Sequence, residues 1–273
     1  MRYSLETLDN GIKFVIRPDL ADDCTIKEIW ENGDYEQVGF MIKEGFTIID
    51  IGAHIGIFTA YAAKKTQTGM VYAYEPHPGN FKLLRANILV NKIKNAKIFN
   101  CGIGETEGVA KLFLWEPPTC YSMYNIYGQD NNFIMIKTVS LVQIFKENCI
   151  RFCDFLKIDT EGAELEILRN VSKEYLNKIG IVVLEYHNIF DKQQLIKLVM
   201  FLSKQGFKIK IRLVHGTKDV GMLYAKNTFF INFRISMLCR NIFEYYKSRV
   251  IFNSYLIPRI IEDALVRIRA KFI

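Results

Sequence analysis

Short apolar runs alternate with amphipathic stretches through the middle of the chain. Five of these runs have the length and apolar character of buried strands, and they span 46–52, 71–75, 96–101, 155–159 and 181–187. Between them, apolar residues recur at helical spacing and predict helices, which span 55–65, 78–90, 139–148, 161–170 and about 191–204. Strands that are apolar throughout and alternate with helices indicate an α/β fold, in which a mostly parallel sheet carries helices on both faces.

Further strands stand outside this alternation. The Asn10–Gly11 pair lies between apolar alternations and predicts a type I′ hairpin. Runs at 110–115 and 133–139 flank a polar, turn-rich loop and predict an inserted β pair. The last two runs, at 207–214 and 222–233, have no clear helix between them. We expect them to close the sheet as an antiparallel pair.

The composition indicates a folded body with a basic tail. Half of the 273 residues are hydrophobic, which is enough for a large core and excludes global disorder. The net charge is +7, and the segment 234–273 carries +5 of it, with eight Lys or Arg against three Asp or Glu. We therefore divide the chain into an N-terminal preamble with a hairpin and helices (1–45), a central α/β domain (46–233) and a basic helical tail (234–273).

The tail has the pattern of an amphipathic helix, because its apolar residues share one helical stripe and its basic residues lie mostly elsewhere. The stripe consists of Ile257, Ile261, Leu265, Ile268 and Phe272. Such a helix can dock on the body, form a homodimer contact or lie on an anionic membrane surface. Nucleic-acid binding is not expected, since no recognition motif accompanies the basic residues.

Cysteine usage and the N-terminus predict a cytoplasmic protein. The tail is the segment that could bind it to the surface of a membrane. The six cysteines are scattered, and the CxxxC pair Cys149 and Cys153 lacks the second half of a zinc site. Reduced thiols that fill core space are the simpler interpretation. The first ten residues lack the apolar segment of a signal peptide. The apolar run 46–63 contains Asp50, whose charge would be costly in a membrane span.

A candidate binding site begins where the strand at 46–52 meets the next helix. The stretch IIDIGAHIGIFT places Asp50, Gly52 and Gly56 at this junction. Gly52 permits a tight turn, and Gly56 permits a close approach of the helix to the strand. A dinucleotide site would need a middle glycine beside the pyrophosphate, but His54 stands there, after Ala53. The turn therefore fits a ligand without a pyrophosphate.

Glu75 ends the next strand, 19 residues after Gly56. An acid at this place accepts hydrogen bonds from ribose hydroxyls, and Asp50 would suit a cationic amine, held directly or through water. S-adenosylmethionine (SAM) combines ribose, ammonium and sulfonium groups and has no phosphate. The turn and Glu75 together indicate SAM as the cofactor. Candidates for the adenine side, which helix-start chemistry or a plain turn would explain equally well, are Pro76, His77, Asn80 and Gly102.

Four blocks of the sequence resemble the FkbM-type SAM-dependent methyltransferases, in the order of that family. They are IIDIGAHIGIFT, VYAYEPHPGNFKLLRANILVN, FLKIDTEGAELEIL and VVLEYH, and they cover roughly residues 46–187. The resemblance implies a class I methyltransferase (Rossmann-like) fold with a seven-stranded sheet whose last strand is antiparallel. It also implies O-methylation, often of sugar or secondary-metabolite hydroxyls. His54 departs from the family, in which Asn is common at this place, and the first 45 residues and the tail lie outside the resemblance.

The strand at 155–159 carries candidates for catalysis. Lys157 lies within an apolar run, where an unpaired ammonium would be costly, so it should reach the pocket or pair with a buried acid. Asp159 ends the strand at the edge where open α/β sheets bind ligands, and it is a candidate for both catalysis and cofactor binding. Glu161 and Glu164 open the next helix, where the helix dipole alone favours acids.

Glu185 and His187 end the strand at 181–187, and their side chains point to the same face. We expect them to lie beside Asp159 in a carboxylate–carboxylate–imidazole cluster. Three interpretations remain open. Asp159 or His187 removes the proton of a methyl acceptor, the cluster binds a divalent cation that acidifies the acceptor hydroxyl, or the cluster is a satisfied structural network.

These observations favour a SAM-dependent methyltransferase that acts on a hydroxyl of a glycan or a small secondary metabolite. A non-catalytic SAM-binding protein with the same fold is the alternative, because a fold does not determine chemistry. An NAD-dependent oxidoreductase is disfavoured by the missing middle glycine. The acceptor itself is not identified, although the polar, tyrosine-rich loop at about 115–133 is expected to help shape its pocket.

Overall fold

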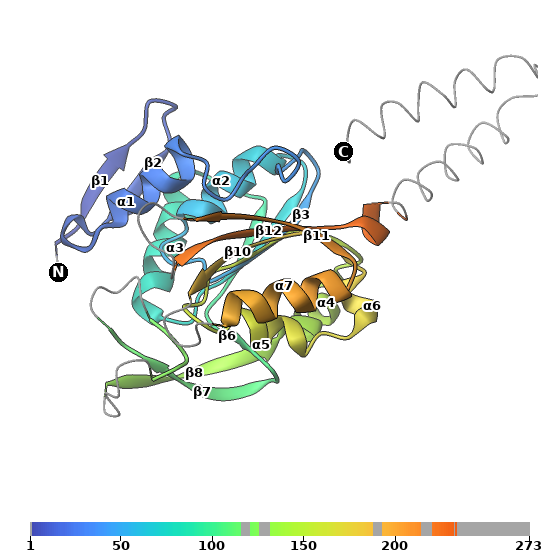
Figure 1. Ribbon diagram of the computed structural model, residues 1–273. Helices are drawn as coiled ribbons and strands as arrows, with labels where there is room; N and C mark the ends of the chain where they lie inside the picture. The colour runs from blue at the N-terminus through green and yellow to red at the C-terminus, as the bar shows by residue number, and fades with distance from the viewer. Residues whose placement is uncertain are drawn as a thin grey trace, which may run out of the picture.

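A seven-stranded sheet forms the centre of the protein, seen in a computed structural model that describes residues 2–115, 121–125, 132–187, 193–213, 220–231 and 233 (Figure 1). Its strand order is β11-β12-β10-β9-β3-β4-β5. The strands are β3 (Thr47–Ile51), β4 (Met70–Tyr74), β5 (Ala96–Phe99), β9 (Cys153–Ile158), β10 (Ile179–His187), β11 (Phe207–Leu213) and β12 (Val220–Asn227). All seven coincide with predicted runs.

Only one strand of this sheet runs against the others. β12 pairs antiparallel with both β10 and β11, whereas the pairs from β10 through β9, β3 and β4 to β5 are all parallel. The predicted fold class and the antiparallel closing pair are therefore confirmed. β3 and β9 are neighbours, and the chain winds outward from them in opposite directions. This switch point is where open α/β sheets bind ligands.

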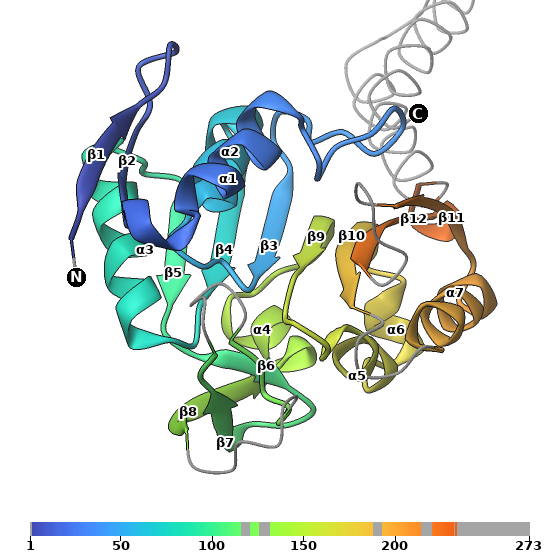
Figure 2. The ribbon, with the colours of Figure 1, turned by 60° about the vertical axis from the view of Figure 1, so that its left-hand side comes forward.

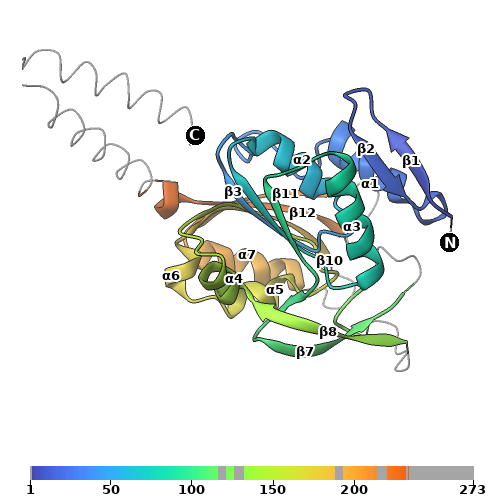
Figure 3. The same ribbon diagram turned by 180° about the vertical axis from the view of Figure 1, so that it is seen from behind.

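Helices cover both faces of the sheet, as predicted (Figures 1 and 3). One face carries α2 (Ile57–Thr66) and α3 (Pro78–Val90), and the other carries α4 (Leu141–Glu147), α5 (Glu164–Arg169), α6 (Lys173–Leu176) and α7 (Gln194–Lys204). Alternate strand residues supply the two cores. Ile49 and Leu156 pack with the α4–α7 layer, while Ile48 and Phe155 pack with the α2 layer. The strands are apolar on both sides for this reason.

The N-terminal residues form a hairpin and three short helical turns against the α2 face. They comprise β1 (Ser4–Thr7), β2 (Lys13–Ile16), a 3-10 turn (Pro18–Leu20), α1 (Asp22–Ile26) and a π-helical turn (Lys27–Glu31). The predicted hairpin is present, but the type I′ turn is wrong. Thr7 pairs with Lys13, so the loop has five residues, and the Asn10 side chain accepts the Ile12 N–H instead of completing a two-residue turn.

This N-terminal segment shares its core with the sheet. Its buried apolar residues, which include Phe14, Ile29 and Tyr35, belong to one cluster with α2. The hairpin is also fastened to α3, because Asn87 and its neighbour one turn on, Asn91, accept hydrogen bonds from the backbone of β2 (Figure 2). The segment therefore forms part of the folded body beside the switch point.

A separate three-stranded sheet lies on the side of the molecule to which the carboxyl ends of β3 and β4 point (Figure 2). It contains the predicted pair, β7 (Gly108–Phe113) and β8 (Phe133–Ser140), and an unpredicted short strand, β6 (Gly102–Gly104). The helix predicted from residue 161 begins only at Glu164, because Glu161 and Gly162 have φ of +54° and +113°. The tail 234–273 and most of the 115–133 loop lie outside the described residues. Among the helices that are described, none is both long and apolar enough to cross a membrane.

Candidate active site

A pocket of about 290 Å³ lies at the carboxyl ends of β3, β4, β9 and β10, beside the switch point of the sheet. Most site residues proposed from the sequence line it. They are Gly52, Ala53, His54, Glu75, Pro76, Asn80, Gly102, Lys157, Asp159 and Glu185. Asp50, Gly56, His77, Glu164 and His187 do not line the pocket, but each of them contacts a residue that does.

The two glycines of the turn are required by close contacts. Gly52 has φ of +75°, and a Cβ there would lie 1.7 Å from the carbonyl oxygen of Asp159. No side chain is compatible with that distance. Gly56 has φ of +88°, and a Cβ there would lie 2.5 Å from Leu84 Cδ1. The predicted close approach at Gly56 is therefore to α3 and not to the strand.

The backbone N–H groups of the turn are used within the protein. Gly52 and Ala53 both donate to the carbonyl oxygen of Tyr74, and Gly56 donates to Ala53. His54 donates to Glu75 Oε2 at 2.8 Å. In a pyrophosphate site such groups would point at the phosphate. Their internal pairing agrees with the interpretation of the sequence that the ligand has no pyrophosphate.

Glu75 is held rigidly at the end of β4. Its carboxylate accepts the backbone N–H of His54 at 2.8 Å and that of His77 at 2.9 Å, and the Asn80 amide lies 3.5 Å away. Burial raises the pKa of Glu75 to about 7, although these hydrogen bonds oppose the increase. A carboxylate has about four acceptor positions, so capacity remains for donors of a ligand.

Arg17, which the sequence analysis did not single out, holds this half of the pocket together. Its guanidinium donates to Asn80 Oδ1 at 2.7 Å and lies 2.7 Å from His54 Nε2, and it forms an ion pair with the buried Asp22 at 2.9 Å. Burial lowers the pKa of His54 to about 4, so its imidazole is neutral and accepts from Arg17. Nothing in the sequence around Arg17 distinguishes it from a surface residue.

Asp50 does not face the pocket, contrary to the prediction that it holds the ligand ammonium. Its side chain is completely buried, accepts the Thr59 hydroxyl at 2.6 Å and lies 3.3 Å from Lys157 Nζ. Asp50 and Lys157 are direct neighbours across β3 and β9. The ammonium also donates to Gly52 O at 2.6 Å and lies 3.5 Å from Asp159. Lys157 therefore both pairs with a buried acid and lines the pocket, as predicted.

Tyr35 from the N-terminal segment reaches the ends of β9 and β10. Its hydroxyl donates to Asp159 Oδ2 at 2.9 Å and lies 3.5 Å from Glu185 Oε2. Burial, with the nearby Asp159 and Glu185, raises the pKa of Tyr35 well above its usual value, so the phenol remains protonated. The sequence analysis missed this residue, because it lies in a segment without periodic pattern and 124 residues before Asp159.

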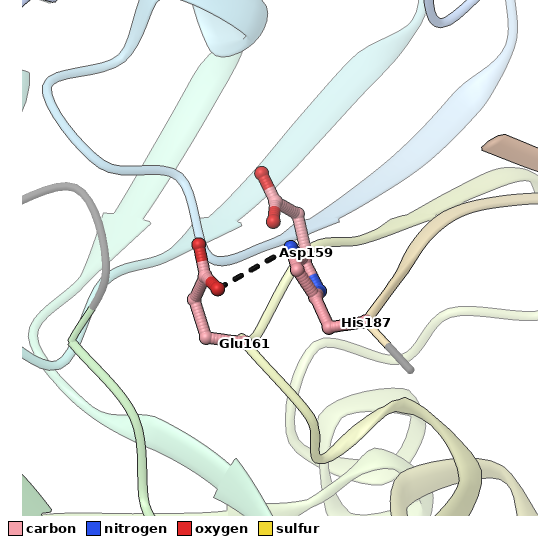
Figure 4. Close-up of side chains that lie close together, drawn as sticks. All are labelled: Asp159, Glu161 and His187. Atoms are coloured by element: carbon pink, nitrogen blue, oxygen red, sulfur yellow. Dashed lines mark ion pairs between the residues drawn. The ribbon is translucent and has the colours of Figure 1, made fainter. Parts of the chain in front are cut away.

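Asp159, Glu185 and His187 form the expected cluster, together with Glu161. Figure 4 shows three of the four side chains, those of Asp159, Glu161 and His187. His187 Nε2 lies 3.3 Å from Glu161 and 3.9 Å from Glu185. Burial alone would lower the pKa of His187, but Glu164, Glu161 and Glu185 outweigh it and raise the pKa to about 10. An imidazole that already carries its proton is not a base, so this arrangement does not favour His187 in that role.

The two helix-start acids have different surroundings. Glu164 is buried and accepts from the Thr160 and Gly162 backbone and from the Gln194 amide, so it satisfies the loop before α5. Glu161 instead lines the pocket. Burial raises the pKa of Glu161 to about 7 and, together with Asp159, that of Glu185 to about 8. This end of the pocket therefore has more acids than the nearby cations neutralise.

Comparisons with known proteins agree with this fold. A model of the "Methyltransferase FkbM domain" matches residues 50–209, which is more than half of the chain. The 31-O-demethyl-FK506 methyltransferase FkbM of Streptomyces tacrolimicus is 24% identical over 212 residues, which are 67% of this chain and 80% of that protein. The hexuronic acid methyltransferase AglP of Haloferax volcanii is 23% identical over 203 residues, which are 71% of this chain and 80% of that protein.

A solved structure shows the same fold. The crystal structure of methyltransferase FkbM from Methylobacillus flagellatus KT aligns with a TM-score of 0.50 at 18% identity, over 73% of this chain. The alignment spans 47% of that longer chain. The fold likeness and the family match, taken with the pocket at the switch point, lead to one assignment. The chain belongs to the FkbM family of methyltransferases, whose cofactor is SAM.

Proposed function

We propose that this protein transfers a methyl group from SAM to a hydroxyl of a glycan or a secondary metabolite. The observation that carries the proposal is the chemistry of the two ends of one pocket. Glu75 at one end suits the hydroxyl donors of a ribose, and Asp159 and Glu185 at the other suit an acceptor that loses a proton.

The polar groups of the glycine turn suit SAM better than a nucleotide. Among the described residues at the ends of β3 and β4, Glu75 is the only acid that lines the pocket. The backbone N–H groups of the glycine turn donate to acceptors within the protein. Apolar lining residues near Gly102, namely Ile103, Leu112 and Met123, suit a flat adenine ring.

When bound, SAM supplies a methyl group on a positively charged sulfur, so that a C–O bond forms as the C–S bond breaks and its electron pair goes to sulfur. The residues of the chain align the acceptor and take its proton. We assign the proton to Glu185, which lines the pocket and whose side chain is 26% exposed. Burial would raise the pKa of Asp159 too, but Lys157 and His187 hold that pKa below its usual value, which makes Asp159 the weaker base.

The names of relatives and the charge of the pocket support a particular class of acceptor. The names of the two relatives refer to an O-demethylated FK506 and to a hexuronic acid. In this chain Glu28, Glu161 and Glu185 line the pocket. Their negative charges would repel the carboxylate of an acidic acceptor. A neutral sugar or a neutral polyhydroxy metabolite is therefore preferred over a uronic acid.

A transfer assay with SAM labelled in its methyl group tests this proposal. Panels of neutral glycans, uronic acids and hydroxylated metabolites are incubated with the full chain, and labelled product is counted. Transfer to a neutral hydroxyl is the expected result. SAM binding without transfer to any acceptor would instead support the non-catalytic alternative, and a chain that does not bind SAM would contradict the proposal.

A further inference from the structure

Two carboxylates and an imidazole lie close together at the ends of β9 and β10 (Figure 4). Asp159 directly follows β9, Glu161 lies in the same loop, and His187 is the last residue of β10. Each offers one ligand atom, and these atoms all lie within 4.8 Å of one another. Two ligands of one ion lie at most about 4.4 Å apart at the usual ligand distances of about 2.0–2.2 Å, so small side-chain movements would bring these two carboxylate oxygens and the imidazole nitrogen around one ion.

The charges around this cluster leave a deficit of cations. Five carboxylates lie in or beside it, and the described cations in contact with them are Lys157 and, when protonated, His187. Lys157 is shared between Asp50 and Asp159. The carboxylates are Asp50, Asp159, Glu161, Glu164 and Glu185. Buried acids in excess of their cations are costly unless a proton or a metal ion compensates them.

The imidazole of His187 is buried in this cluster, but one of its nitrogens lacks a hydrogen bond to any described residue. The residue is 4% exposed, and its Nδ1 has no hydrogen-bond partner among the described residues, the nearest acidic oxygen being that of Glu164 at 3.8 Å. Its Nε2 faces Glu161 at 3.3 Å. With Nε2 directed at Glu161 and Nδ1 toward the carboxylate of Glu164, His187 has the surroundings that suit a metal-ligating histidine.

The supporting residues also favour an ion at this point. Tyr35 and Lys157 both contact Oδ2 of Asp159, which leaves Oδ1 as the second oxygen of that carboxylate. The positive φ of Glu161 turns its side chain out of the α5 helix and into the pocket wall. Glu185 remains beside the cluster and outside the ligand set.

We propose that Asp159, Glu161 and His187 bind one divalent cation at the acceptor end of the pocket. One imidazole with two carboxylates favours a first-row transition-metal ion such as Mn²⁺, Co²⁺ or Zn²⁺ over Ca²⁺. On binding, the ion displaces the Nε2 proton of His187 to solvent. Its catalytic role rests on the proposed function: the ion polarises the acceptor hydroxyl, whose proton then passes to Glu185.

Titration of the metal-free full chain with Mn²⁺, followed by electron paramagnetic resonance of the free ion, tests the site. The wild type should bind one equivalent. Glu161→Gln and His187→Gln should each weaken the affinity at least about tenfold. Glu174→Gln is the matched control, since Glu174 is exposed and pairs only with Lys178 among the described residues, and it should bind as the wild type does.

Calorimetric titration of the same metal-free samples with SAM separates this inference from the proposed function. SAM that binds while Mn²⁺, Co²⁺ and Zn²⁺ do not would overturn the metal site and leave the methyltransferase proposal intact. Mn²⁺ that binds equally well to Glu161→Gln and the wild type would also overturn it. Because His187→Gln can disturb the buried cluster, thermal unfolding is compared first, and Glu161→Gln, whose side chain is 20% exposed in the wild type, decides the outcome.

Discussion

The two halves of the pocket compensate their buried polar groups in different ways. At the ends of β3 and β4, backbone and side-chain donors are matched to acceptors within the protein, as the bonds from the glycine turn to Tyr74 and Glu75 show. At the ends of β9 and β10, carboxylates of Asp159, Glu161 and Glu185 surround a single imidazole, with Lys157 as the other cation among the described residues in contact.

The difference is consistent with the roles proposed for the two halves. A cofactor site benefits from groups that are already oriented, because no reorganisation is then needed during the reaction. A site that removes a proton needs groups that change protonation or bind a cation near neutral pH. Burial raises the pKa of Glu161 to about 7 and that of Glu185 to about 8, as is expected of the second kind of site. The first half is thus rigid, and the second is electrostatically unbalanced.

The largest effect is expected from breaking the rigid half at Gly52. In Gly52→Ala the new Cβ meets Asp159 O at 1.7 Å, so β3 and β9 must separate. We expect a loss of more than about 4 kcal/mol of stability and no measurable SAM binding. Gly39→Ala is the control, since Gly39 has φ of +89° but nothing within 4 Å, and it should cost about 1–2 kcal/mol. Equal losses in urea unfolding would show that backbone strain, not the contact, matters at Gly52.

Lys157 joins the two halves, and its removal is expected to have the next largest effect. Lys157→Met leaves Asp50 buried without its cation and should destabilise the fold by about 3–5 kcal/mol in chemical denaturation. Adding Asp50→Asn should restore a large part of this loss, because the uncompensated charge is then gone. A double variant that is less stable than Lys157→Met would contradict the assignment of Asp50 to a structural role.

Glu185→Gln probes the unbalanced half without disturbing the rigid one. We expect kcat for methyl transfer to fall roughly 100-fold or more, since the amide cannot take the acceptor proton. The Kd for SAM should remain within about twofold, because the Glu75 half is unchanged. Single-turnover kinetics with a labelled methyl group measure the first quantity and calorimetry the second. An unchanged kcat would remove Glu185 from the role of base.

The smallest effect is a pH dependence of cofactor binding that originates at Glu75. Burial raises the pKa of Glu75 to about 7, and hydroxyl donors bind the ionised carboxylate better. Affinity should therefore rise with pH up to about 7, by at most about tenfold per unit, and level off above it. 5′-Methylthioadenosine is the suitable probe, since it keeps the ribose and lacks the amino acid part.

The origin of this dependence is checked with two variants. Glu75→Gln should flatten the curve, whereas Glu185→Gln should keep it, because Glu185 belongs to the other half. If the Glu185 variant flattened the curve and the Glu75 variant did not, the ribose would have been placed at the wrong end of the pocket.

Local sequence was enough to predict the rigid half and the strands that carry it. Gly52 and Glu75 occupy their places because of spacing along one strand–turn–helix–strand segment, and such spacing is visible in the sequence. The need for glycine at Gly56 was also predicted, but its close neighbour is Leu84 of α3 and not the strand. The cluster of Asp159, Glu185 and His187 was also predictable, because residues at the carboxyl ends of neighbouring parallel strands meet.

The contributions that the sequence did not reveal depend on tertiary contacts. Asp50 was predicted to contact the ligand because it lies at a strand end. The sequence does not show that Lys157 of the neighbouring strand β9, more than 100 residues away, pairs with it instead. Tyr35 and Arg17 come from an N-terminal segment without periodicity. The proton on His187 reflects the balance of three surrounding acids, which no spacing rule encodes.

The central claim is that the pocket takes a nucleoside cofactor without a pyrophosphate, and calorimetric titration of the wild-type chain tests it most directly. SAM and its demethylated product should each bind with one-to-one stoichiometry at micromolar concentration, and NAD should not. Saturable binding of NAD with no binding of SAM or of its demethylated product would contradict the account.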